Sequence, residues 1–162
     1  MIRTTATAAL VLSLLAAPVF AQSVQASVRD ARVTAHDKAS VQAASKFYQN
    51  VFGAREITVI DRAGTPGLCE SILGFGASVE AARASPAARI VIMTSAEPIS
   101  ATVPHLVMTV SDMAAVFSAI AANGGKVVSG PTRTPELPQV TGMVTDPAGN
   151  RVELVQADAP KN

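Results

Sequence analysis

The sequence is poor in the residues that usually build reactive centres, since its 162 residues include one cysteine, two histidines, one tyrosine and no tryptophan. A single cysteine, Cys69, excludes an intrachain disulfide, and without a second cysteine no thiolate zinc site can form. We interpret Cys69 as a small buried residue, with a reactive or intermolecular thiol as the alternative. Any histidine ligand must be His36 or His105.

Charge is also scarce, because charged residues make up 15% of the chain and the net charge is +1. Arg3 is the only charged residue among the first 21, so removing that segment would leave equal numbers of basic and acidic residues. A neutral chain without a basic run has no electrostatic footprint for nucleic acid or for an anionic membrane. We therefore expect neither as a partner.

The N-terminus has the pattern of a secretory signal peptide. Arg3 precedes a short apolar stretch over 8–17, and residues 19–21 form a small-x-small cleavage site. The apolar stretch is too short for a membrane-spanning helix, which needs about 20 residues. We predict a signal peptide over 1–21, a flexible leader over 22–30 and an exported protein, periplasmic or secreted, with no stable membrane span after cleavage. An uncleaved N-terminal anchor is the alternative.

Hydrophobic periodicity predicts the same order of elements twice, namely a strand, a helix and three strands. The first module is expected over 31–97. Its helix, over 41–52, carries apolar residues at helical spacing and is closed by Gly53. The alanine-rich stretch 77–88 fits either a loop or a short helix. Strands are expected over 31–39, 56–60, 71–75 and 89–94.

The second module is expected over 104–157. Asp112 is a good N-cap for a helix that ends at the Asn-Gly-Gly of residues 123–125. A proline-rich loop is expected over 131–138, and the Asp-Pro-Ala-Gly-Asn turn of residues 146–150 closes the last hairpin. Strands are expected over 105–110, 126–129, 142–145 and 151–155.

Three motifs in this order resemble those of the vicinal oxygen chelate superfamily, which contains glyoxalases, bleomycin-resistance proteins and extradiol dioxygenases. They are FYQNVFGA at 47–54, HLVMTVSD at 105–112, and TDPAGNRVELV at 145–155. The resemblance covers residues 31–156. It implies an α+β fold in which two βαβββ modules form curved mixed sheets around a groove.

The resemblance also implies a metal site in the groove, with one ligand from the first and one from the last strand of each module. In module 2 these positions hold His105 and Glu153, and strand alternation independently places both on the face opposite the helix. In module 1 they hold Thr34 and Ile92, so two of the four glyoxalase-type ligands are missing. This departure argues against an ordinary glyoxalase I.

His36 offers a replacement ligand, because it lies two residues beyond Thr34 on the same strand face, about 7 Å further along. With His105 and Glu153 it would complete a two-histidine-one-carboxylate triad, the composition found in non-heme Fe(II) oxygenases and in extradiol dioxygenases of this superfamily. A shift of about 7 Å is large against metal–ligand bonds of about 2 Å, so the triad needs a strand slip or a bulge. In the alternative, His36 is a solvated residue at the strand end.

The resemblance leaves open whether the protein is an enzyme. The first hypothesis is a divalent-metal lyase, isomerase or dioxygenase acting on a small oxygenated molecule, with Fe, Ni, Mn, Co or Zn as the metal and Glu153 as the catalytic base. The second is a metal-free protein of the bleomycin-resistance type that sequesters a small ligand, although such grooves are often richer in aromatic residues than this chain. The third is a relative whose groove binds a partner or acts only as a dimer.

Substrate contacts are expected from Thr34, Thr109 and Arg151. A homodimer is expected because many family members form the groove between chains.

Overall fold

The computed structural model describes residues 29–61, 69–99, 106–133 and 139–157, so the predicted signal peptide and most of the leader lie outside the described residues. The first half contains β1 (Asp30–Ala35), α1 (Lys38–Phe52), β2 (Arg55–Asp61), β3 (Cys69–Gly74), α2 (Val79–Ala84) and β4 (Arg89–Thr94). The second half contains β5 (Leu106–Thr109), α3 (Met113–Ala122), β6 (Lys126–Arg133), β7 (Gln139–Thr145) and β8 (Arg151–Ala157).

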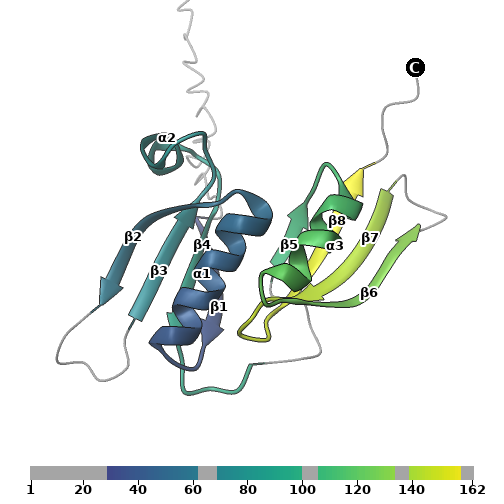
Figure 1. Cartoon of the computed structure of the whole chain (residues 1–162). Coiled ribbons are helices and arrows are strands. Elements are labelled where there is room, and N and C mark those ends of the chain that lie inside the picture. The colour runs from purple at the N-terminus through teal and green to yellow at the C-terminus, as the bar shows by residue number, and fades with distance from the viewer. Residues whose placement is uncertain (1–28, 62–68, 100–105, 134–138, 158–162) are drawn as a thin grey trace, which may run out of the picture.

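These strands form two four-stranded mixed sheets that lie side by side (Figure 1). Sheet 1 has the order β1-β4-β3-β2, and sheet 2 has the equivalent order β5-β8-β7-β6. In each sheet the first strand of the half pairs in parallel with the last strand, and the other neighbours are antiparallel. The predicted α+β fold of two βαβββ modules is thereby confirmed, with α2 as an added short helix in the stretch that the sequence left open.

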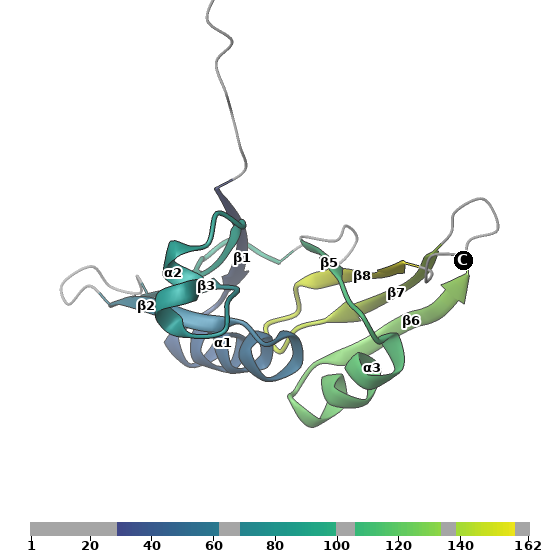
Figure 2. The same cartoon turned by 90° about the horizontal axis from the view of Figure 1, so that it is seen from above.

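The core lies between the sheets and the two longer helices. Figure 2 shows α1 and α3 on the same side of the two sheets, and the helices also contact each other. Strand alternation buries every second side chain beneath them. Val33 and Ile90 are buried under α1, Val152 and Leu154 under α3, and all belong to one hydrophobic cluster that runs through both halves.

The predicted first strand, 31–39, is too long at its C-terminal end. The strand stops at Ala35, and α1 begins at Lys38, three residues before the predicted start. The cause is Asp37, which has an extended backbone and whose carboxylate accepts a hydrogen bond from the Ser40 N–H at 2.7 Å. Such an N-cap satisfies an otherwise unpaired N–H of the first turn and fixes where the helix starts.

The predicted proline-rich loop is also wrong at its start. β6 does not end at Ser129 but continues through Pro131 to Arg133, with register shifts against β7 on the way. β6 is the edge strand of sheet 2, where β7 is its one neighbour among the strands that the structure describes. An edge strand tolerates proline, because the missing N–H would have faced away from the sheet.

Asn150 joins the two halves. Its side-chain Nδ2 donates to the Thr34 carbonyl at 2.9 Å, and its Oδ1 accepts from the Thr34 N–H at 3.2 Å. Thr34 belongs to β1, whose only neighbour among the described strands is β4, so the amide pairs with the outer edge of sheet 1 as one residue of an added strand would. A side chain in the last turn of the second half therefore holds the first strand of the first half in place.

Within the described part of the chain, no helix is long and apolar enough to cross a membrane.

Candidate functional site

Each sheet has a face turned away from α1 and α3, and we call these two surfaces the open faces. On β8, Val152 and Leu154 are fully buried in the core, so Glu153 between them lies on the open face of sheet 2, where it is half-buried. Its partner on the parallel strand β5 is Val107. The predicted position of Glu153 opposite the helix agrees with this burial pattern.

The open face of sheet 1 carries Asp30, Arg32 and Thr34, because the alternate residue Val33 is buried in the core. Nη1 of Arg32 donates to the sulfur of Met93 at 3.6 Å, which places Met93 of β4 on the same face. This face therefore combines charged, hydroxyl and thioether groups.

The assignment of Ile92 to the groove is wrong. Ile92 is fully buried beneath α1, and its partners on the adjacent strands are Val33 and Ser71. The open-face residues of β4 are its neighbours, Val91 and Met93. A shift of one residue along a strand exchanges its two faces, which accounts for the error.

The counterpart of Glu153 in the first half is Val91. Each is the third residue of the last strand of its half. Their parallel partners, Arg32 for Val91 and Val107 for Glu153, each lie five residues before the aspartate that caps the next helix. An aliphatic side chain therefore stands where the second half has a carboxylate.

The counterpart of His105 is Asp30 by the same count. Asp30 lies seven residues before the N-cap Asp37, and His105 lies seven residues before the N-cap Asp112. The assignment of this position to Thr34 came from counting back from Phe47 in the FYQNVFGA motif. Counted instead from the helix caps, the position falls on Asp30.

The donor set at these positions is Asp30, Glu153 and His105, with Val91 contributing nothing. Two carboxylates and an imidazole are a suitable set for a divalent first-row metal ion. Asp30 is mostly buried and forms an ion pair with Nε of Arg29 at 3.5 Å. His105 lies outside the described residues, and the described residues alone contain no group of three histidine, cysteine or acidic side chains that could hold a metal ion.

The other predicted site residues are not brought into one cluster. His36 is exposed and lies in the bend after β1, outside the strand that the triad hypothesis assumed. Thr109 is exposed on β5, and Arg151 is half-buried two residues before Glu153. Among the described residues neither Arg151 nor Arg32 forms an ion pair with a carboxylate.

Sequence reasoning missed a buried polar network that links the halves. The Tyr48 hydroxyl of α1 donates to Oδ2 of Asp146 at 3.1 Å, and Asn150 donates to the same carboxylate through its backbone N–H (2.9 Å) and its Nδ2 (2.8 Å). Burial raises the pKa of Asp146, and the hydrogen bonds from Asn150 and Tyr48 oppose the rise. The pKa of Tyr48 lies well above its usual value, first because of burial and then because of Asp146. The sequence identified the turn of residues 146–150 as closing the last hairpin, but it could not show that Asp146 and Asn150 meet Tyr48.

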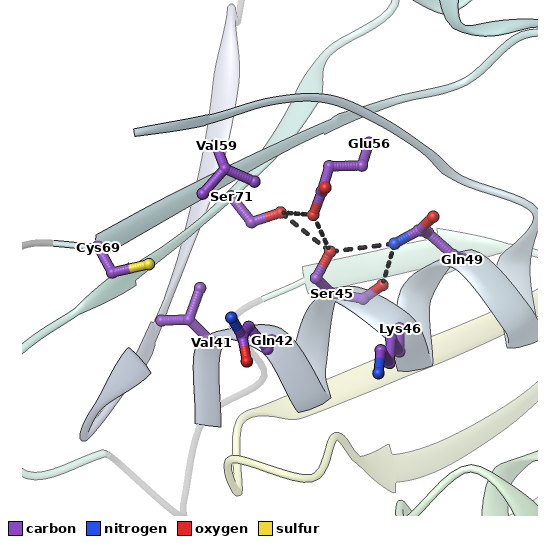
Figure 3. Close-up of a pocket in the computed structure, with 9 residues that line it drawn as sticks. All are labelled: Val41, Gln42, Ser45, Lys46, Gln49, Glu56, Val59, Cys69 and Ser71. Carbon is purple, nitrogen blue, oxygen red and sulfur yellow. Dashed lines mark hydrogen bonds between the residues drawn. The ribbon is translucent and has the colours of Figure 1, made fainter. Parts of the chain in front are cut away.

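A second polar cluster lies under α1, at the edge of sheet 1 (Figure 3). Ser45 of α1 and Ser71 of β3 both donate to Oε2 of Glu56 on β2, at 2.8 and 2.9 Å. In the sequence, the sign that Ser45 is buried was its position four residues after Val41, on the predicted buried face of the helix.

Cys69 lines the same cavity and is buried, as expected. Burial and then the Asp61 carboxylate raise the pKa of its thiol, which disfavours the reactive thiolate.

The chain matches one family and several solved folds. The sequence profile of the Glyoxalase/Bleomycin resistance protein/Dioxygenase superfamily matches residues 39–154. A comparison with curated proteins found no significant match. The fosfomycin resistance protein FosX from Listeria monocytogenes has a TM-score of 0.62 and 16% identity, covering 80% of this chain and 92% of its own. A mutant FosX, complexed with Mn(II) and 1S,2S-dihydroxypropylphosphonic acid, has a TM-score of 0.59 and 17% identity, with 80% and 91% coverage.

A mutant of glyoxalase I from Zea mays has a TM-score of 0.58 and 18% identity, covering 81% of this chain but only 45% of the maize chain. At these identities the similarity establishes the fold alone. The profile match is more specific, because it spans most of the chain, from the first turn of α1 to Glu153 and Leu154 of β8. This protein belongs to the Glyoxalase/Bleomycin resistance protein/Dioxygenase superfamily.

Proposed function

We propose that this protein binds a divalent metal ion and a small oxygenated anion on its open faces, with Asp30, His105 and Glu153 as the metal ligands. The observation that carries the proposal is the position of Asp30, which matches that of His105 in the other half when counted from the helix caps. A metal ion held there would act as a Lewis acid on the oxygens of the ligand. Glu153 stays our predicted base for a lyase, isomerase or dioxygenase reaction.

Two arginines supply the charge that would hold the anion. Arg32 lies on the open face of sheet 1 and Arg151 on that of sheet 2, and neither is paired with a carboxylate among the described residues. A guanidinium group binds carboxylate or phosphonate oxygens through two parallel hydrogen bonds. Thr34 and Thr109 add hydroxyl groups on the same faces. The phosphonate and Mn(II) in the FosX complex support this ligand class.

Val91 favours a second candidate, a metal-free binding protein. It places an aliphatic side chain at the counterpart of Glu153, which leaves at most three of four ligand positions with a donor. A protein that only sequesters its ligand would need the two arginines and no metal.

Replacing Asp30 or Glu153 by alanine is expected to weaken Mn(II) binding at least about tenfold, since each variant removes one of three donors. Isothermal titration calorimetry of the purified protein with MnCl₂ measures the effect. Glu70→Ala is the matched control, because Glu70 lies on the open face of sheet 1, opposite Met93, outside the proposed ligand set. We expect Glu70→Ala to bind Mn(II) like the unmodified protein.

His36→Ala separates this ligand set from the triad. If His36→Ala abolishes Mn(II) binding and Asp30→Ala does not, the triad is correct and the assignment of Asp30 is wrong. If the unmodified protein binds no Mn(II), the metal proposal fails. Titration with 1S,2S-dihydroxypropylphosphonic acid in the presence of a chelator then tests the binding protein, and Arg151→Ala should weaken that binding while the exposed Arg55→Ala of β2 should not.

We also propose that the protein is exported and dimeric. The support for export is the signal-peptide pattern over 1–21, and the support for a dimer is the outer edge of β6, which pairs with no further strand of the described residues and carries the exposed Val127 and Val128. Native mass spectrometry of the exported fraction tests both at once. We expect a dimer of chains that begin at Gln22, whereas a monomer or a chain that retains residues 1–21 would contradict the respective part.

A further inference from the structure

The cavity under α1 is separate from the open faces. It lies between α1 and the strands β2 and β3, on the helix-covered side of sheet 1, and its volume is about 330 Å³ (Figure 3). Ser45 and Gln49 line it from the helix, Glu56 and Val59 from β2, and Cys69 and Ser71 from β3. This volume is at the lower end of the range for small-molecule pockets, roughly 300–1,000 Å³.

The cavity exists because the core stops short of β2. The buried residues beneath α1 come from β1, β3 and β4, and no described residue of β2 belongs to the cluster. At the edge of this layer the helix and sheet present Ser45 and Ser71, which are 2% and 1% exposed. Two small hydroxyl side chains at buried positions leave a space that leucine or isoleucine would have filled.

The hydrogen bonds in the cavity fix one oxygen of Glu56. Oε2 accepts from both serine hydroxyls, and Gln49 Nε2 donates to Ser45 Oγ at 3.1 Å. Oε1 accepts no hydrogen bond from the described residues, and no cation of the described residues lies within ion-pair distance of the carboxylate. The half-buried charge of Glu56 is therefore positioned but not neutralised, and such a charge favours a cationic partner.

The surroundings restrict that partner to a small amine. Lys46, the one cation among the described residues that line the cavity, points away from Glu56 in Figure 3. Val41, Val59 and Cys69 add apolar surface to the lining of the same cavity, which suits a short hydrocarbon body. We propose that this cavity is a second ligand site, for a small primary amine whose ammonium group donates to Oε1 of Glu56.

The test is an NMR titration of the ¹⁵N-labelled protein with n-butylammonium chloride. We expect saturable shifts of the backbone amides of Ser45, Glu56 and Ser71, and an affinity at least about tenfold weaker in Glu56→Gln, which loses the charge but keeps the shape. The matched control is Glu70→Gln, the same substitution on the neighbouring strand β3 but on the open face, where the affinity should not change. The neutral isostere butan-1-ol should bind less well than the amine.

Several outcomes would overturn the proposal. These are the absence of saturable shifts around the cavity, an unchanged affinity in Glu56→Gln, or equal binding of butan-1-ol. The spectrum of each variant also reports whether it is folded. If Glu56→Gln is not folded, Val59→Phe replaces it, because Val59 lines the cavity opposite Ser71 and is 47% exposed, so that a phenylalanine there would occupy the space beside the polar cluster. Amine shifts that persist in Val59→Phe would place the binding elsewhere.

Discussion

Replacing Asn150 by alanine should lower the free energy of unfolding by about 4 kcal/mol, the largest effect that we expect from a polar substitution in this chain. The Asn150 side chain is fully buried and makes three hydrogen bonds, two to the backbone of Thr34 and one to Asp146. Alanine lacks the amide group and so removes all three hydrogen bonds. The Thr34 N–H and C=O are then left unpaired at a partly buried strand edge. Each unsatisfied buried group costs about 1–3 kcal/mol.

Asn50→Ala is the matched control for this substitution. Asn50 also makes an amide hydrogen bond between the halves, from its Nδ2 to Oδ1 of Asn123 at 2.8 Å, but that bond is exposed to solvent. Because water replaces the lost partner, we expect a change below about 0.5 kcal/mol. Urea-induced unfolding of both variants gives the comparison. Equal losses in Asn150→Ala and Asn50→Ala would show that Asn150 does not hold the halves together.

The periodicity of the sequence was sufficient to predict most of the secondary structure and the repeat. The predicted strand over 89–94 coincides with β4, and Asp112 caps α3 through its carboxylate and the Ala115 N–H at 2.9 Å. These features depend on local sequence, because the N-cap residue and the side-chain spacing act within a few residues. The face of Glu153 was predictable for the same reason, since it stands between two large apolar residues.

The face of β4 could not be predicted in this way. Ile90, Val91 and Ile92 are all apolar and all buried, so this central strand shows no alternation that distinguishes its two faces. Because both faces of the strand are apolar, the sequence could not distinguish Val91 from Ile92, and Ile92 was assigned to the open face in error. Only the pairing of β4 with β1, which sets Arg32 opposite Val91, resolves the register.

Contacts between the halves were beyond local reasoning altogether. Asn150 and Thr34 are separated by 116 residues, and Tyr48 and Asp146 by 98. Periodicity describes which face of an element is buried, but not which distant side chain it meets. The motifs that contain Tyr48 and Asn150 therefore indicated the family correctly, while the hydrogen bonds that they make required the fold.

Tyr48→Phe should lower the free energy of unfolding by about 2 kcal/mol near neutral pH, because it removes a hydrogen bond to a buried carboxylate. The ring of Tyr48 packs edge-on against Phe47, and phenylalanine keeps that contact. The substitution therefore isolates the hydroxyl group, whose only hydrogen bond among the described residues is the one to Asp146.

The loss should depend on pH through Asp146. Burial gives Asp146 a folded-state pKa above its ordinary value, so its contribution to stability is complete below the unfolded pKa and is lost as the pH rises through the folded pKa. The Tyr48 hydroxyl lowers that folded pKa, and removing it raises the pKa further. The two proteins should therefore differ most above both folded pKa values, where Asp146 is ionised, and the difference should shrink as the pH falls and the carboxyl takes up a proton.

Urea-induced unfolding at about pH 7 and about pH 4 measures this dependence. The Asp146→Asn background is the control, because a residue that cannot ionise should make the effect of Tyr48→Phe independent of pH. A double-mutant cycle of the two substitutions then gives the coupling between hydroxyl and carboxylate directly. If Tyr48→Phe costs the same at both pH values in the unmodified background, the hydroxyl does not stabilise the charge of Asp146.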